Sequence, residues 1–289
     1  MTLCIAWLRS VGDAEELLIA SDSRLRMGCA WDCGPKIMTL PRSDAAICFA
    51  GHTYDAYPLM IQMANAIASH PPSRSRAMDL CDMKGHTVRV FNHMRAQIHD
   101  LPNNQTTADP PDAYFILAGY SWRKQRFYIW RLHHDASIGK FTYRPVRLWS
   151  GVRGKKQIGF AGDYVPEAKE RLIDLLRARK RLTVGGFDME PFEVLRDMIR
   201  DGQHPHIGGP PQMVKIYRHM NVKPYAIYWP NREAGSLSLL GRPLLDYEVT
   251  QGLVLDPDTL VMEPCPASPQ KTSDGQQDEC TLSAGAAEA

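Results

Sequence analysis

The sequence has little that would mark a membrane, secreted or nucleic-acid-binding protein. It contains no apolar run close to the ~20 residues that a transmembrane helix needs. No basic region precedes the first apolar residues, and Asp13, Glu15 and Glu16 interrupt them, which is not the pattern of a secretory signal. The formal net charge of +2 is too small to indicate a nucleic-acid partner. We therefore expect neither a membrane nor a nucleic acid as a partner.

The seven cysteines form neither a disulfide framework nor a zinc site. Their odd number and scattered positions are typical of reduced thiols, which predicts a cytoplasmic protein. Cys29 and Cys33 lie four positions apart, but no second pair accompanies them at zinc-finger spacing. The sequence therefore predicts no metal and no other cofactor.

Apolar segments of two kinds alternate in groups along the chain. Short, nearly continuous apolar segments predict strands covered on both faces. Stripes at i, i+3, i+4 and i+7 predict helices, the first capped by Thr53 or Asp55. The predicted strands are 2–8, 16–21, 36–40, 45–51, 113–120, 126–132, 140–143, 157–161, 212–217 and 225–229. The predicted helices are 56–67, 83–101, 168–176 and 192–199.

The order of these segments predicts the fold class. Strands are followed by two helices, strands, two helices and strands again, which is not the alternation of a doubly wound parallel sheet. It predicts an α+β protein in which two mainly antiparallel sheets stack face to face with helices on both outer faces. This is a four-layer αββα sandwich. We expect one domain over residues 1–262, and a disordered tail over 263–289, where Pro, Ser, Gln, Asp, Gly and Ala dominate.

Four residues at segment ends carry the chemistry that we expect. Thr2 opens the first predicted strand, Asp22 closes the second, Lys36 opens the third, and Gly51 joins the fourth to a helix. The stretches around them read IASDSR at 19–24, KI at 36–37 and AGHTYDA at 50–56. With this order and spacing, the first 67 residues resemble proteasome β-type subunits, including the bacterial ATP-dependent protease subunit and the ancestral β-subunit group.

The resemblance implies an N-terminal-nucleophile hydrolase fold and a threonine-type peptidase activity. Removal of Met1 would make Thr2 the nucleophile, and its own α-amine, with an ordinary pKa of about 8, would be the base. The amine acts only when neutral, and a Lys36 ammonium nearby would disfavour its protonation. Asp22 would hold Lys36 charged and in place. The Gly51 amide would donate to the oxyanion, since glycine permits a close approach there.

The resemblance also implies a substrate pocket lined by residues that flank these positions. They are Leu25, Gly34 and Phe49, with His52 as a further candidate at the start of the helix. Phe49 would make the pocket shallow or apolar, which favours a small or hydrophobic residue before the scissile bond. The other interpretation is that Phe49 belongs to the core and that His52 is a surface or capping residue.

Two later turns depart from the family's pattern. The family uses a Ser in a Gly-Ser-Gly-like turn, and this chain reads GFAG at 159–162, with Ala161 in the place of the Ser. A second Ser and an Asp are expected before a glycine, and this chain reads HIGG at 206–209. Asp163 and His206 are candidates to replace the lost groups. These departures bear on activity more than on fold.

Three functions remain open on the sequence alone. The first is a peptidase acting on peptides or unfolded proteins within a homo-oligomeric ring or barrel, with or without an ATPase unfoldase. The second keeps the fold but acts on a small amide. The third is an inactive scaffold or binding module that has the same fold. The first is favoured because Thr2, Asp22, Lys36 and Gly51 occur together.

Overall fold

The computed structural model describes residues 2–26, 28–102, 105–149, 156–234, 236–250 and 252–265. Within these ranges the chain is an α+β protein with antiparallel sheets, as the order of segments predicts, and it has five helices where four were predicted. The helices are α1 (Thr53–Ser69), α2 (Pro71–Arg74), α3 (Leu80–Arg95), α4 (Val165–Ala178) and α5 (Glu190–Arg200).

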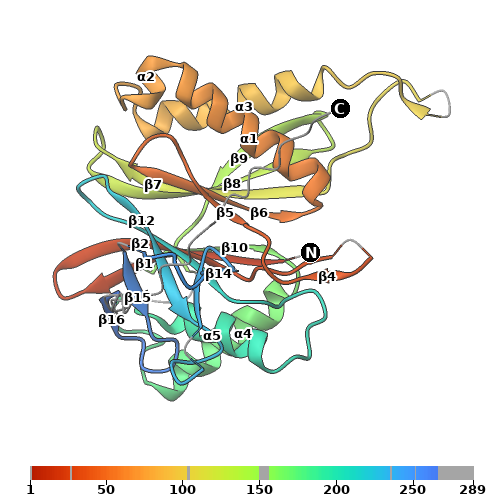
Figure 1. The fold of residues 1–289 in the computed structure, drawn as a ribbon. Helices are drawn as coiled ribbons and strands as arrows, with labels where there is room; N and C mark the ends of the chain where they lie inside the picture. The colour runs from red at the N-terminus through yellow and green to blue at the C-terminus, as the bar shows by residue number, and fades with distance from the viewer. Residues whose placement is uncertain are drawn as a thin grey trace, which may run out of the picture.

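One large sheet contains both the first strand of the chain and most of the late ones (Figure 1). Its main path runs β10 (Ile158–Gly162), β1 (Leu3–Val11), β2 (Ala14–Ser21), β11 (Gln212–Ile216), β12 (Val222–Tyr228), β13 (Leu237–Leu239) and β14 (Arg242–Pro243). Beside β12, and parallel to it, lies β15 (Leu253–Leu255), which pairs in turn with β16 (Met262–Pro264). The remaining pairings in this sheet are antiparallel.

The second sheet is antiparallel throughout and comes from the middle of the chain. Its strands follow one another in sequence order as β5 (Ile37–Thr39), β6 (Ala45–Gly51), β7 (Ala113–Ser121), β8 (Arg126–Asp135) and β9 (Lys140–Pro145). A separate small hairpin pairs β3 (Leu25–Arg26) with β4 (Ala30–Trp31).

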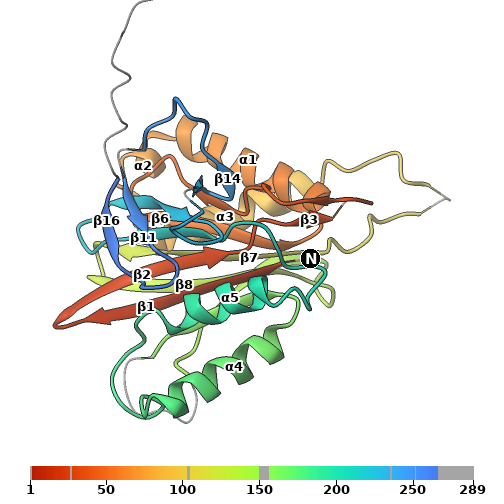
Figure 2. The ribbon, with the colours of Figure 1, turned by 60° about the horizontal axis from the view of Figure 1, so that its bottom comes forward.

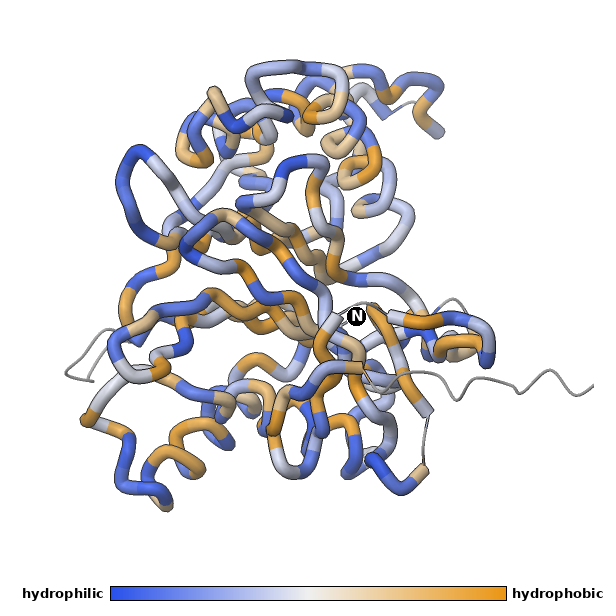
Figure 3. The backbone as a smooth tube through the Cα atoms, turned by 60° about the vertical axis from the view of Figure 1, so that its left-hand side comes forward, coloured by the Kyte–Doolittle hydropathy of each residue, from blue (hydrophilic) through white to orange (hydrophobic). Residues whose placement is uncertain are grey.

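Helices and sheets bury three large apolar clusters. Helices α1 and α3 lie over the β5–β9 sheet, and α4 and α5 lie under the large sheet (Figures 1 and 2). One cluster lies between each helix pair and its sheet, and the third joins facing strands of both sheets. The strands in the middle of the molecule are mostly apolar, as Figure 3 shows. Strands β1, β2, β6, β7 and β11 are buried along most of their length, which explains their continuous apolar segments.

Several local predictions were wrong. Helix α1 begins after His52, which makes no side-chain capping bond, so neither Thr53 nor Asp55 is the N-cap. The second predicted helix, 83–101, corresponds to α3, which ends at Arg95 and not at residue 101. The described part of the chain ends with β16 and Cys265, so the boundary predicted at 262 lies inside a strand. The rest of the predicted tail lies outside the described residues.

None of the helices in the described ranges is long and apolar enough to cross a membrane.

Candidate functional site

The topology brings the ends of five strands to one edge of the molecule. Strand β1 pairs antiparallel with β2 and with β10, so the start of β1 lies beside the ends of both neighbours. Strand β5 pairs antiparallel with β6, so the start of β5 lies beside the end of β6. Thr2, Asp22, Lys36, Gly51 and Asp163 each stand at one of these strand ends. This edge lies near the N mark in Figure 1, between the two sheets.

Asp22 and Lys36 form a fully buried ion pair. The Lys36 Nζ lies 2.9 Å from both carboxylate oxygens of Asp22, and both side chains are 0% exposed. The main-chain N–H of Leu3 donates to Asp22 Oδ1, and those of Arg24 and Gly208 donate to Oδ2, each at 3.1 Å. Burial of such a pair is costly unless every lone pair is used, and these five bonds meet that condition.

The Gln212 side chain fixes the main chain on both sides of this ion pair. Its Oε1 accepts from the N–H of Lys36 at 3.0 Å and from that of Ile37 at 3.3 Å. Its Nε2 donates to the carbonyl oxygens of Asp22 at 3.2 Å and Gly34 at 2.8 Å. Gln212 is 0% exposed and begins β11. The sequence gives no sign of this role, because a lone Gln at a strand start has no distinctive pattern.

Thr2 is held by main-chain contacts to the end of β10. Its N–H donates to Asp163 Oδ2 at 3.1 Å, and the Asp163 N–H donates to the Thr2 carbonyl at 2.7 Å. Thr2 is 1% exposed. Since the next residue, Leu3, donates to the same Asp22 oxygen that Lys36 contacts, the start of the chain lies directly beside the buried ion pair. Asp163 therefore contacts the main-chain nitrogen of Thr2, whereas Ala161 pairs with Cys4 in the register of β10 and β1.

Gly162 makes this contact between β10 and Thr2 possible. Its φ of +113° is in the region that side-chain-bearing residues rarely adopt, and an added Cβ would lie 1.8 Å from the Thr2 carbonyl oxygen. The same added Cβ would lie 3.3 Å from the Cβ of Ala50, the residue before Gly51. Thr2, Gly162 and Ala50 are therefore packed together.

We expect Gly162→Ala to destabilise the protein by about 2–4 kcal/mol, because it adds backbone strain and a clash at Thr2. Gly139→Ala is the matched control, since Gly139 has a φ of +62° and no heavy atom within 4 Å of an added Cβ. It should cost only about 1 kcal/mol. Urea unfolding of both variants measures the difference. Equal losses would show that the contact with Thr2 contributes nothing.

Gly51 ends β6 in a turn that only glycine fits. Its φ is +104°, and an added Cβ would lie 2.1 Å from the carbonyl oxygen of Asp112. The same carbonyl accepts from the N–H of His52 at 2.7 Å, and the Asp112 N–H donates to Asp55 Oδ2 at 3.1 Å. The turn from β6 into α1 is thus fixed by the residues that precede β7.

The four residues predicted to line a pocket have different environments. Leu25 is 4% exposed and its side chain fills the space beside Gly34, where an added Cβ would lie 2.3 Å from it. Phe49 is buried in the same apolar cluster, with its ring edge-to-face against Tyr57 at 5.1 Å. His52 is half exposed, with Nε2 3.6 Å from Asp112. Leu25, Gly34 and Phe49 are neighbours of the site that are closed to solvent in this conformation.

The thiols near Thr2 are poor candidates for a competing nucleophile. Cys4 and Cys48 are buried between the sheets, and the Cys4 thiol donates to the carbonyl oxygen of Phe49 at 3.1 Å. Burial, followed by the bond with Cys4, raises the pKa of the Cys48 thiol well above its ordinary value. A buried thiol held protonated is inert, because the thiolate is the reactive form. Cys29 is exposed but lies outside this cluster.

The loop before β11 is tied to the site through histidines and an arginine. Arg24 binds Asp32 through two bonds of 2.7 and 2.8 Å, and its guanidinium lies against Gly208. The ring of His206 stacks on Tyr164 with the centroids 6.3 Å apart, and its Nδ1 is buried with no partner among the described residues. His206 therefore lies beside the residue that follows Asp163.

His204 joins α4 to the end of α5 below this loop. Its Nε2 lies 2.9 Å from Glu167 and its Nδ1 lies 3.1 Å from Asp201. Burial opposes protonation, but the bonds with Glu167 and Asp201 prevail and raise the His204 pKa. The bond with His204 lowers the Glu167 pKa. Burial alone would raise the Asp201 pKa, but the bonds with Gln203, Arg171 and His204 outweigh it and lower the pKa overall.

Stability should therefore depend on pH through His204. A raised pKa in the folded state stabilises fully below the ordinary value of about 6.5, and this contribution is lost as the pH rises through the folded-state pKa. As the pH rises from about 6 to about 8, we expect the melting temperature of the wild type to decrease more than that of His204→Gln. Thermal melts across this range measure it, and parallel curves for the two proteins would rule the effect out.

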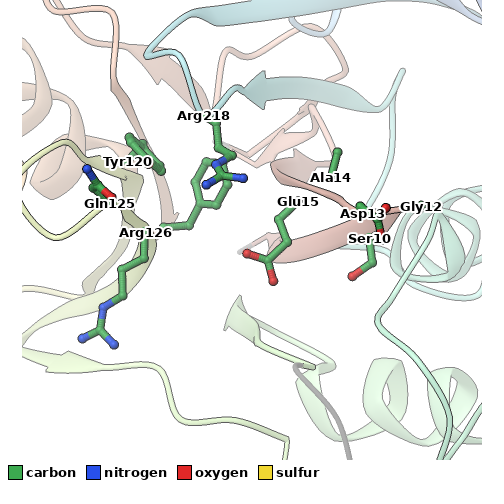
Figure 4. A pocket seen from close by; sticks show the side chains of 10 residues that line it. Ser10, Gly12, Asp13, Ala14, Glu15, Tyr120, Gln125, Arg126 and Arg218 are labelled. Atoms are coloured by element: carbon green, nitrogen blue, oxygen red, sulfur yellow. The ribbon is translucent and has the colours of Figure 1, made fainter.

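A cavity of about 380 Å³ opens at the end of the sheets opposite to Thr2. Figure 4 shows Glu15, Tyr120, Arg126 and Arg218 around it. Strand β1 has nine residues, so at ~3.3 Å per residue the hairpin that lines this cavity lies about 30 Å from Thr2. None of the predicted site residues lines it.

Comparison with known proteins adds no relative to this picture. A scan against models of protein families found no match, and a search of curated proteins found none of similar sequence.

Proposed function

We propose that the chain is an N-terminal-nucleophile hydrolase, a four-layer αββα sandwich of the proteasome β-subunit kind, with Thr2 as the nucleophile once Met1 is removed. One observation carries the proposal. Asp22 Oδ1 accepts from the Lys36 ammonium and from the N–H of Leu3. The buried Lys36 cation therefore shares an acceptor with the residue that directly follows Thr2. Even with all these bonds made, a Lys–Asp pair that is buried this deeply adds little net stability, which favours a functional reason for keeping it.

The proposed reaction begins with attack of the Thr2 hydroxyl oxygen on the carbonyl carbon of an amide. The hydroxyl proton passes to the neutral Thr2 α-amine, and the main-chain N–H of Gly51 stabilises the oxyanion. The C–N bond then breaks, and the α-ammonium returns the proton to the departing amine. Water, deprotonated by the same amine, cleaves the resulting ester and releases the carboxylate and the Thr2 hydroxyl.

Asp163 and Lys36 would act on the Thr2 amine in opposite directions. The Lys36 ammonium disfavours a second positive charge nearby, which lowers the pKa of the amine and keeps it in the neutral form that can accept a proton. The Asp163 carboxylate, 3.1 Å from the same nitrogen, favours the ammonium form and also aims the lone pair. Asp163 would thus position the amine but raise its pKa, which leaves less of the amine neutral at low pH.

This balance gives a prediction for Asp163→Asn. Loss of the carboxylate lowers the amine pKa, so the acid limb of the pH–rate profile should move to lower pH by about one unit. The measurement is kcat/KM on a fluorogenic amide between pH 5 and 9. Asp13→Asn, an exposed aspartate in the hairpin at the far end of β1, about 30 Å from Thr2, is the control and should leave the profile unchanged. A shift to higher pH would contradict the role assigned to Asp163.

The substrate class that fits the proposal is a peptide or an unfolded segment of protein. Leu25, Gly34 and Phe49 adjoin the site, and opening of their packed side chains would admit a small or apolar residue before the scissile bond. The proposal includes assembly into a homo-oligomeric ring or barrel, which light scattering after gel filtration tests. A monomer with full activity on a small amide would instead favour a small-substrate amidase.

Intact-mass spectrometry of untagged protein tests the nucleophile directly. The expected spectrum lacks the mass of one Met and gains one adduct with a threonine-directed electrophile such as a peptide epoxyketone. Cys29→Ser protein should give the same adduct, because the exposed thiol of Cys29 is the competing target. A chain that retains Met1 would exclude Thr2 as the nucleophile and leave the fold assignment untouched.

A further inference from the structure

A cleft of about 780 Å³ lies on the outer edge of β10, between the β5–β9 sheet above and α4 below. The large sheet ends at β10, whereas the other sheet continues outward through β8 and β9, so part of its inner face has no strand opposite it. The side chains on this uncovered face include Tyr114, His133, Arg131 and Arg144. An inner sheet face normally carries apolar residues, so its cationic character here requires an explanation.

Two arginines of this face stand directly opposite each other. Arg131 of β8 and Arg144 of β9 are cross-strand partners in the register. Like charges at such positions destabilise a sheet. Arg144 reaches Asp135 only at 3.8 Å with its own side chain 72% exposed, so this contact offsets little of the repulsion. Arg147 and Lys169 add two further cations from the opposite walls of the cleft.

The described residues that line the cleft do not balance these cations. None of the described residues that line it is an Asp or a Glu. Burial, followed by the positive charge of Arg144, lowers the pKa of His133, in line with a positive potential inside. Large apolar side chains also lie open to solvent here, with Tyr114 44% and Leu148 61% exposed. The lining therefore suits a ligand that carries both carboxylates and apolar groups.

We propose that this cleft binds an extended acidic segment of polypeptide, with Arg131 and Arg144 paired to its carboxylates. Guanidinium groups bind carboxylates through two parallel bonds, and two neighbouring guanidinium groups match acidic residues two positions apart, whose side chains lie on the same side of an extended segment. A nucleic acid fits less well, because the whole chain carries a net charge of only +2 with a pI of about 8.1. Nucleic-acid binding relies on a broad basic surface, which this charge does not provide.

The cleft and the Thr2 site share strand β10 but are distinct. Residues Ile158, Gly159 and Phe160 line the cleft, whereas Gly162 and the following Asp163 contact Thr2. A segment bound in the cleft would lie along β10 in line with Thr2, which would position it as a docking site for longer polypeptides. Binding does not depend on hydrolysis, so the two proposals are tested separately.

Fluorescence anisotropy with a labelled heptapeptide of four Glu, one Leu and two Gly residues tests the proposal on the full chain. We expect saturable binding at physiological salt, and binding about tenfold weaker for the same peptide with Gln in place of Glu. The double variant Arg131→Gln/Arg144→Gln should bind at least tenfold more weakly. Arg89→Gln, which removes an exposed arginine from α3, should bind like the wild type.

Thermal melts provide an independent readout and show that the double variant is folded. Without ligand and at low salt, Arg131→Gln/Arg144→Gln should melt at a temperature equal to or above that of the wild type, because the like-charge pair is gone. The Glu peptide should raise the melting temperature of the wild type only. The proposal is overturned if the Glu peptide fails to bind, or binds the double variant equally well. It is also overturned if an oligouridylate binds more tightly than the peptide, or if the double variant only changes the oligomeric state.

Discussion

Replacing Lys36 with Met should destabilise the protein by about 3–5 kcal/mol, the largest effect that we expect for a single substitution away from the nucleophile. The variant leaves the Asp22 carboxylate charged, 0% exposed and without its cation. The three main-chain N–H groups of Leu3, Arg24 and Gly208 still bind the carboxylate, which keeps the loss from being larger. Unfolding in urea measures the change, with the same dependence of the unfolding free energy on urea concentration used for both proteins.

Two further variants separate the lost ion pair from the lost side chain. Lys140→Met removes an exposed lysine at the start of β9 and should change stability by less than about 0.5 kcal/mol. Lys36→Met/Asp22→Asn removes both charges but keeps a side-chain oxygen for the main-chain N–H groups of Arg24 and Gly208, so it should recover part of the stability lost in Lys36→Met. A loss below about 1 kcal/mol in Lys36→Met would mean that Asp22 is not charged in the folded protein.

Lys36→Met should also lose most of its reactivity even where it remains folded. Without the ammonium beside it, the Thr2 amine becomes more basic and is protonated over more of the neutral pH range. Labelling by the epoxyketone, corrected for the folded fraction, should therefore slow and recover at higher pH. Unchanged labelling across the pH range would exclude Lys36 from the mechanism and leave its structural role intact.

Strands and site residues near the N-terminus were predictable because each has a strong local signal. The segments that form β1, β2 and β6 are continuous apolar runs, and such runs predict strands buried on both faces. Antiparallel pairing of consecutive strands then places alternate strand ends at the same edge. For this reason a polar residue at the start of one strand and at the end of the next, such as Thr2 and Asp22, could be expected to meet.

Contacts across long stretches of sequence were not predictable to the same degree. Asp163 was only a substitute candidate, and its bond with the Thr2 nitrogen depends on the pairing of β1 with β10, whose register no local pattern reveals. The same holds for Gln212, which contacts Asp22 and Lys36 because β11 inserts beside β2. Polar residues at strand starts are common, so spacing alone cannot select these two.

Short strands and helix ends were missed for a different reason. Strands β13, β14 and β15 have only two or three residues each, too few for a period to emerge. Strands β13 and β15 form because each pairs with β12, and β14 pairs in turn with β13, which is a tertiary effect. Helix α1 begins at Thr53 because the bond of the His52 N–H to the Asp112 carbonyl sets the turn, so no side-chain cap is required.

Thr2→Ala should lower kcat/KM on a fluorogenic peptide amide by about 10³-fold or more, equivalent to about 4 kcal/mol of transition-state stabilisation. The loss should be specific to catalysis. Both contacts of Thr2 with Asp163 use main-chain atoms, so alanine preserves them and the start of β1 keeps its place. The free energy of unfolding should accordingly change by less than about 1 kcal/mol. A chain that keeps its stability and loses its turnover identifies the Thr2 hydroxyl as the reacting group.

Thr2→Ser and Thr39→Ala complete the comparison. Serine supplies the same oxygen and still allows removal of Met1, so Thr2→Ser should retain activity within about tenfold and should form the epoxyketone adduct. Thr39, an exposed threonine at the end of β5, should be replaceable without effect. If Thr2→Ala hydrolyses the peptide amide as fast as the wild type while Met1 is removed from both, the hydroxyl is not the nucleophile. The buried Asp22–Lys36 pair would then serve only to join the ends of β2 and β5.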